Sequence, residues 1–293
     1  MTSYQPNNSK GRPKVSTTTT TAIQPQYRTI DRVSIRFAES AQRDDHAILL
    51  NPWPESMLAW DQIWLRLSEQ MHLVAIDLPG FGLSERREDL LSPKAMGEFL
   101  IKAADSFGLA QPHIVGPDVG TGTALFAAAE SPGRLRSLAV GSGGTAVPIQ
   151  LGGVLKEWVE NPDFDSYRRA DPRQIVNAAM GAIQKYEIPD RIREDYLAGY
   201  VGDRFVESMR YVRTYPEQLP MLEDLLPGIQ TPVQIIQGAR DTAVPAANGE
   251  FLRDRLPKNK YDVIDAGHFS WEEAPDDYAE ILLSWWAGGC RAV

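Results

Sequence analysis

The chain has 293 residues, of which 43% are hydrophobic, so it is long enough for one large buried core or for a core with an inserted subdomain. Its formal net charge of -9, with no extended basic run, repels a phosphate backbone on average and argues against a nucleic-acid partner. We therefore expect a small molecule as the partner.

The sequence also bounds the compartment. No stretch approaches the roughly 18 apolar residues needed to cross a bilayer, so we expect a soluble protein without a membrane partner. The single cysteine, Cys290, excludes an internal disulfide framework and fits a reducing compartment such as the cytoplasm. Residues 1–25 are polar and lack the apolar segment of a secretory signal. We expect them to form a disordered tail; their low arginine content makes a transit peptide the weaker alternative.

The first predicted elements are strands. The stretches "QYRTI" and "VSIRFAES" alternate as half-buried antiparallel strands do, with a turn at Asp31 and Arg32 between them. Short apolar runs typical of parallel strands follow, with helical patterns between them. The alternation predicts a doubly wound, mostly parallel sheet that binds ligands at the carboxyl ends of its strands. The strand runs are 46–52, 73–79, 113–118 and 135–141, and the helical patterns are 57–70, 92–109 and 123–132.

The rhythm changes after Gly144. Residues 145–228 contain helical segments but no convincing core strand, which predicts an inserted helical cap. The sheet pattern then resumes with a strand at 232–241 and ends with a closing helix through "DDYAEILLSWW". The predicted core therefore consists of residues 26–144 and 229–293.

The segment "HIVGPDVGTG" carries the strongest chemical signal. A strand that enters Gly-x-Asp-x-Gly and leaves directly as a helix makes a sharp turn, which thrusts the central side chain above the sheet. Asp118 occupies that centre. The alternative is that Asp118 only caps the following helix.

Two further residues join Asp118 in the predicted site. Asp241 follows a strand in "GARDTAVP", and His268 follows the last strand in "AGHFSWEEAP". Each alone also fits a turn, a cap or an ordinary loop residue. All three side chains nevertheless leave strand ends on one side of a parallel sheet, in the order nucleophile, acid, histidine, which predicts a catalytic triad.

These motifs, together with "NPWPES" and "DLPGFGLSE", resemble α/β-hydrolase fold enzymes of the epoxide hydrolase and haloalkane dehalogenase branch. The resemblance runs from about Tyr27 to the closing helix and is interrupted by the cap. It implies an α/β-hydrolase fold and a largely apolar small-molecule substrate that reacts with water. The four histidines show no clustered ligand spacing, so we expect neither a metal nor a cofactor.

An aspartate nucleophile suits a particular reaction. A carboxylate is already ionised at neutral pH, so Asp118 needs no base to displace a leaving group from a saturated carbon and form an ester. His268 then activates the water that cleaves the ester, while Asp241 orients the imidazole. The resemblance places oxyanion donors at the backbone N–H groups of Val119 and Trp53. The loop before Trp53 departs from the family, because Asn51 and Pro52 replace the usual histidine and glycine.

The leaving group is less well specified. Epoxide hydrolases of this branch protonate the leaving oxygen from two cap tyrosines, and Tyr211 in "SMRYVRTYPEQLP" is our candidate, without an assigned partner. A haloalkane or haloacid dehalogenase is the alternative; since Val119 has no polar side chain, Trp53, Asn51 or Trp158 would have to bind the halide. A ligand-binding or lyase-like protein on the same fold is the alternative of another class. The substrate and the oligomeric state stay open.

Overall fold

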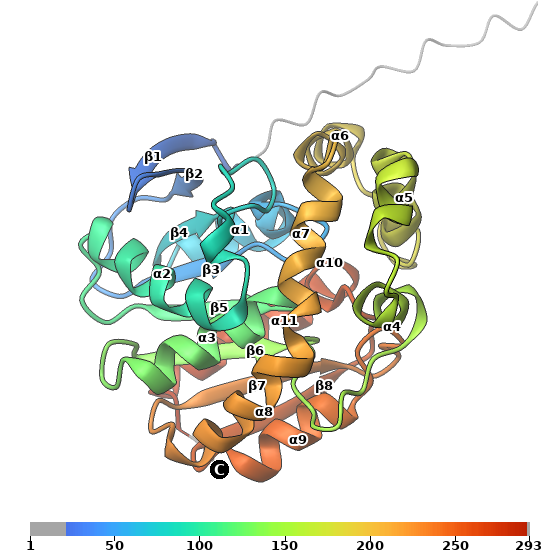
Figure 1. Ribbon diagram of the computed structural model, residues 1–293. Helices are drawn as coiled ribbons and strands as arrows, with labels where there is room; N and C mark the ends of the chain where they lie inside the picture. The colour runs from blue at the N-terminus through green and yellow to red at the C-terminus, as the bar shows by residue number, and fades with distance from the viewer. Residues whose placement is uncertain (1–21, 292–293) are drawn as a thin grey trace, which may run out of the picture.

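A computed structural model describes residues 22–291, with an eight-stranded sheet at the centre (Figure 1). The strands lie in the order β1-β2-β4-β3-β5-β6-β7-β8. The pairings among β3 to β8 are parallel, whereas β1 and β2 form an antiparallel hairpin and β2 pairs antiparallel with β4. The expected α/β-hydrolase fold is thereby confirmed. The strands are β1 (Gln26–Ile30), β2 (Val33–Glu39), β3 (His46–Leu50), β4 (His72–Ile76), β5 (His113–Pro117), β6 (Ser137–Gly141), β7 (Val233–Gly238) and β8 (Asn259–Ile264).

The N-terminal boundary differs from the expectation. Residues 1–21, which make up most of the predicted tail, lie outside the described residues. Ile23, which the sequence analysis assigned to that tail, is fully buried in the core. A single apolar residue in a polar stretch carries no periodic signal, which is why the pattern placed the boundary after it.

The core helices follow the expected alternation with the strands. Helix α1 packs against α11, which closes the chain, and α2 packs against α3. Helix α3 is apolar on nearly all sides and buried over most of its length, as a helix in the middle of a large core should be. The core helices are η1 (Met57–Trp60), α1 (Asp61–Ser68), η2 (Glu88–Leu90), α2 (Pro93–Ser106), α3 (Val119–Glu130), α9 (Ala247–Arg255), α10 (Ser270–Glu273) and α11 (Pro275–Ala287).

The interval between β6 and β7 contains helices and no strand among the described residues, and we call residues 145–228 the helical insertion. In Figure 1 its helices α4 to α7, coloured from yellow-green to orange, form a layer beside the sheet. Its helices are α4 (Gly153–Glu160), η3 (Phe164–Arg169), α5 (Pro172–Met180), α6 (Asp190–Gly199), α7 (Arg204–Arg213), α8 (Tyr215–Leu225) and η4 (Leu226–Gly228).

Buried polar contacts hold the helical insertion over the ends of β3 and β4. Arg36 of β2 donates to both carboxylate oxygens of Asp195 in α6, at 2.9 and 2.5 Å, and also faces Asp77 at 3.3 Å. Tyr200 donates to the carbonyl of Glu55, which follows β3, at 3.0 Å. Because Asp77 directly follows β4, these contacts position the insertion at the carboxyl edge of the sheet.

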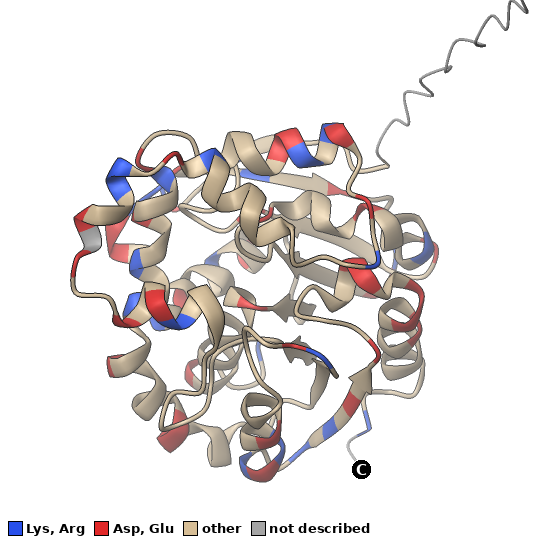
Figure 2. Cartoon of the chain, turned by 90° about the vertical axis from the view of Figure 1, so that its right-hand side faces the viewer, with Lys and Arg blue, Asp and Glu red and all other residues tan. Residues whose placement is uncertain are grey.

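The surface carries both signs of charge. Figure 2 shows Lys and Arg interspersed with Asp and Glu over the helices, without a face of a single sign in that view. Among the described residues, no helix is both long and apolar enough to span a bilayer.

Candidate active site

The turn between β5 and α3 holds Asp118 in an unusual backbone conformation. Its φ of 52° and ψ of -123° lie in a region that costs a non-glycine residue free energy. The bend is tight, because a Cβ added to Gly116 would lie 2.8 Å from the Gly120 carbonyl oxygen. The Asp118 N–H donates to the carbonyl of Gly141 at 2.9 Å, which ties the turn to β6. Neighbouring structure therefore fixes the direction of the Asp118 side chain.

The carboxylate of Asp118 points into a closed site rather than capping α3. The side chain makes no capping hydrogen bond to that helix, and the residue is only 5% exposed. Its Oδ2 accepts a hydrogen bond from the backbone N–H of Trp53 at 2.6 Å, and the Val119 N–H also binds the carboxylate. Both expected oxyanion donors thus contact the carboxylate of Asp118, and the Trp53 N–H binds its Oδ2.

His268 and Asp241 complete the arrangement. The imidazole Nε2 lies 3.8 Å from Asp118 Oδ1, and Nδ1 lies 2.9 Å from Asp241 Oδ2. The other oxygen of Asp241 accepts from the N–H groups of Ala243 and Val244, at 3.0 and 2.8 Å. One oxygen of Asp241 therefore stabilises the turn that follows it, and the other orients the imidazole so that Nε2 points toward Asp118.

Burial sets the protonation of this site. It raises the pKa of Asp118 to about 6, against the opposing effects of His268 and of the two N–H donors. The carboxylate is therefore mostly ionised at neutral pH. Burial disfavours a charged His268, but the Asp241 charge, its hydrogen bond and the Asp118 charge outweigh that penalty and raise the pKa of the imidazole.

The loop that departs from the family is braced by its own side chains. Asn51 accepts a hydrogen bond from the N–H of Leu78 at 2.7 Å and donates to the carbonyl of Pro52 at 2.9 Å. Asn51 thus joins the ends of β3 and β4 and holds the chain that carries the Trp53 N–H. Since Pro52 lies one residue before that donor, its missing N–H costs the site nothing.

Two of the three candidate halide donors are engaged elsewhere. The indole N–H of Trp53 donates to the Ser208 hydroxyl of α7 at 2.9 Å, and the Asn51 amide is bound to its own loop. Trp158 packs edge to face on Trp53, with ring centroids 5.1 Å apart, and Phe205 stacks on Trp53 at 5.4 Å. These rings form an apolar aromatic cluster between the loop that carries the Trp53 N–H, which we call the oxyanion loop, and the helical insertion.

The tyrosines of the insertion differ in their contacts. Tyr211 donates to the carbonyl of Val119 at 2.6 Å and shares a hydrogen bond with Thr123 at 2.8 Å, so its hydroxyl binds the start of α3. The Tyr215 ring packs against Tyr211, and its hydroxyl has no hydrogen-bond partner in the part of the chain that the structure describes. Burial and the charges of Tyr211 and Asp118 raise the pKa of Tyr215. Tyr211 lies in α7, whereas Tyr215 is the first residue of α8.

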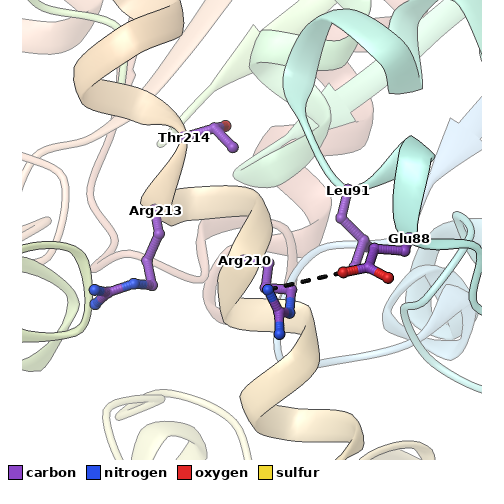
Figure 3. A pocket seen from close by; sticks show the side chains of 5 residues that line it. All are labelled: Glu88, Leu91, Arg210, Arg213 and Thr214. Atoms are coloured by element: carbon purple, nitrogen blue, oxygen red, sulfur yellow. Dashed lines mark ion pairs between the residues drawn. The ribbon is translucent and has the colours of Figure 1, made fainter. Parts of the chain in front are cut away.

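An open hollow of about 340 Å³ lies away from the triad. It is lined on α7 by Arg210 and Arg213, followed by Thr214, and across from them by Glu88 and Leu91. Figure 3 shows the ion pair between Arg210 and Glu88, which are 3.9 Å apart. No residue of the predicted triad lines this hollow.

The geometry agrees with comparisons to known proteins. The family model described as the alpha/beta hydrolase fold matches residues 46–275, which is most of the chain. The chain belongs to the alpha/beta hydrolase fold family. Among its relatives, this hydrolase is 25% identical to 2-hydroxymuconate semialdehyde hydrolase of Pseudomonas sp. strain CF600 over 76% of its own length and 79% of the relative's.

Solved structures share the fold of this hydrolase. The enol-lactonase from Burkholderia xenovorans LB400 superposes with a TM-score of 0.75 at 18% identity, over 89% of this chain and 100% of the other. The epoxide hydrolase CorEH superposes with a TM-score of 0.75 at 17% identity, over 91% and 99% of the two chains. Names as different as these show that the fold leaves the substrate undecided, so the residues of the site must decide it.

Proposed function

We propose that this hydrolase forms an ester between Asp118 and a saturated carbon of its substrate, and that it opens an epoxide to a diol. The proposal rests mainly on one observation: the two oxygens of Asp118 have different contacts. Oδ2 accepts a hydrogen bond from the Trp53 N–H at 2.6 Å, while Oδ1 faces His268 Nε2 at 3.8 Å. A carboxylate held in this way has one oxygen fixed and the other directed at the substrate.

A carboxylate at the elbow argues against acyl transfer. Attack of Asp118 on an ester or lactone carbonyl would produce an acid anhydride, which is more reactive than the ester or lactone that it replaces. Attack on a saturated carbon produces an alkyl ester instead, which is stable enough to need an activated water. The site holds such a base in His268, oriented by Asp241.

The first step requires a proton for the leaving oxygen. As Oδ1 bonds to the ring carbon, the carbon–oxygen bond of the epoxide breaks, and the new alkoxide takes a proton from a tyrosine hydroxyl. Tyr211 and Tyr215 are the proposed donors. Tyr215 has its hydroxyl available among the described residues, whereas Tyr211 must turn its O–H away from the Val119 carbonyl. An alkoxide is a stronger base than a buried tyrosinate, so the transfer is favourable even with the raised pKa of Tyr215.

The second step follows from the charges of the site. Ester formation removes the negative charge of Asp118, which is one of the effects that raise the pKa of His268. The imidazole therefore becomes more readily neutral when a base is needed. It takes a proton from water, the hydroxide attacks the Asp118 carbonyl, and the oxyanion forms beside the Trp53 and Val119 donors. Imidazolium then protonates the departing alcohol, and the acid left at Asp118 restores the tyrosine proton.

The surroundings favour an apolar substrate and an epoxide over a halide. Trp53, Trp158 and Phe205 present aromatic surface beside the oxyanion loop. A halide needs N–H donors, but the indole of Trp53 and the amide of Asn51 are both occupied, which leaves only the Trp158 indole of the three candidates. We therefore rank carbon–halogen hydrolysis second.

A single-turnover experiment in water labelled with heavy oxygen tests the mechanism. With enzyme in excess over an aryl or alkyl epoxide, the diol of the first turnover should contain unlabelled oxygen from Asp118, and the label should appear in the Asp118 carboxylate. Direct attack of water would put the label into the diol at once. Measuring diol against chloride or bromide release from matched substrates separates the two leading reactions.

A further inference from the structure

Two buried glutamates meet beside the triad without taking part in it. Glu55 lies two residues after Trp53 in the oxyanion loop, and Glu272 lies in α10, four residues after His268. Their exposed fractions are 0% and 2%. The pair therefore joins the two segments that carry the oxyanion donor and the general base.

In each of the two carboxyl groups, one oxygen accepts a hydrogen bond and the other has no donor among the described residues. Glu55 Oε2 accepts from the indole N–H of Trp271 at 2.9 Å, and Glu272 Oε1 accepts from the Tyr196 hydroxyl of α6 at 2.8 Å. Glu55 Oε1 and Glu272 Oε2 are buried without a donor from any other described residue. The two carboxyl groups lie close together, because Glu55 binds the indole of Trp271, the residue before Glu272, and each carboxyl group shifts the pKa of the other. A proton on one carboxyl group would let it donate to the other and so satisfy these buried oxygens, because ionised carboxylates have no hydrogen to donate.

The surroundings favour that proton. Burial raises the pKa of Glu55 and of Glu272, and the charge of Asp118 acts on Glu55 while that of Glu273 acts on Glu272 in the same direction. The hydroxyl of Tyr196 faces the pair from the helical insertion, and the pair's charges also act on Tyr186. None of the groups that shift the pKa of Glu272 in the described chain is a cation.

The pair also reaches the general base directly. The ring of Trp271, whose N–H binds Glu55, packs edge to face on the His268 ring, with centroids 6.0 Å apart. A change in the spacing of the two carboxyl groups would therefore move the indole that supports the imidazole. The same change would move the loop that carries the Trp53 N–H.

We propose that Glu55 and Glu272 share a single proton and act together as positioning residues, which hold the Trp53 loop at a fixed distance from the His268 segment. The inference rests on the proposed function, because it assigns the pair to the machinery of Asp118 and His268. Loss of the shared proton leaves two facing carboxylates in a buried site, and their repulsion separates the two segments. Turnover should therefore fall on the alkaline side as the proton is lost.

The test replaces the titrating partner with an amide. In Glu272→Gln the amide N–H donates to Glu55 at every pH, so kcat near neutral pH should stay close to the wild-type value. The alkaline limb of the pH profile of kcat, where kcat falls, should move upward by about one pH unit or more. In Glu272→Ala the bond is lost at every pH, and kcat should fall about tenfold throughout. Glu207→Gln is the matched control, since this largely buried carboxylate pairs with arginines, and its alkaline limb should match the wild type.

A second measurement needs no substrate. At about pH 8, Asp118 and Asp77, with pKa values of about 6, are ionised, so the infrared band of a protonated carboxyl group in the wild type should come from the pair and vanish in Glu272→Gln. An absent band, or an alkaline limb that Glu272→Gln leaves in place, overturns the inference. If no epoxide or halide is turned over, the proposed function fails, while the infrared result still decides whether the pair shares a proton.

Discussion

Replacing Asp118 by asparagine should make the folded protein more stable near neutral pH, at the expense of activity. Burial raises the pKa of Asp118 from an ordinary value of 3.8 to about 6. Each unit corresponds to about 1.4 kcal/mol, so ionising Asp118 costs the folded state about 3 kcal/mol relative to the unfolded chain. Asparagine keeps an oxygen for the Trp53 N–H and removes the buried charge.

The sign of the pH dependence follows from the raised pKa. The folded protein holds the Asp118 proton more tightly than the unfolded chain, so this residue's favourable contribution is complete below about pH 4 and is lost as the pH rises through about 6. The advantage of Asp118→Asn should therefore be near zero at about pH 3 and approach about 3 kcal/mol at about pH 8.

Urea unfolding at a series of pH values measures this difference in the free energy of unfolding. The comparison requires that the free energy of unfolding falls with urea concentration at the same rate in both proteins. Asp276→Asn is a suitable control, because the Asp276 side chain is fully exposed on α11, and its stability difference should not vary in the same way. A difference between Asp118→Asn and the wild type that is constant from pH 3 to pH 8 would refute the reasoning, since it would mean that the Asp118 charge is not desolvated.

Other variants address the remaining parts of the site. Asp241→Asn should slow cleavage of the ester by about 10³- to 10⁴-fold and let the intermediate accumulate in rapid-quench experiments, since the amide cannot stabilise the imidazolium. Tyr211→Phe should lower the free energy of unfolding by about 1–2 kcal/mol through its lost bond to Val119, whereas Tyr215→Phe should lower kcat at unchanged stability; equal stability losses would contradict this division. Asp195→Ala should cost about 2 kcal/mol in thermal unfolding, less than a fully broken buried pair, because Arg36 keeps Asp77.

The sequence was most informative where chemistry coincides with the ends of strands. Asp118 and Asp241 each follow an apolar run, and His268 follows the last strand. Parallel strands bring their carboxyl ends to one edge of the sheet, so the grouping follows from topology alone. The elbow adds a local signal, because its glycines allow the tight bend that Asp118 adopts.

What the sequence could not show depends on side-chain packing between distant segments. Glu55 and Glu272 are far apart in the chain, and only the fold reveals that both are buried with one oxygen lacking a partner and that Glu55 binds the neighbour of Glu272. The spacing of four between Tyr211 and Tyr215 predicts a shared helix face, whereas the structure places them in two successive helices, α7 and α8. The hydrogen bond to Val119 then decides that the Tyr211 hydroxyl is the engaged one. Asn51 departs from the family motif, and its bracing role depends on Leu78 of a neighbouring loop.

The most direct test of the alkyl-ester mechanism uses His268→Gln, which keeps the nucleophile and removes the base. Incubation with a mixed panel of epoxides and haloalkanes should add the mass of one substrate to the intact protein, and digestion should place that mass on the peptide containing Asp118. Turnover by wild type on the same panel, with no adduct on Asp118 in the folded variant, would contradict the mechanism.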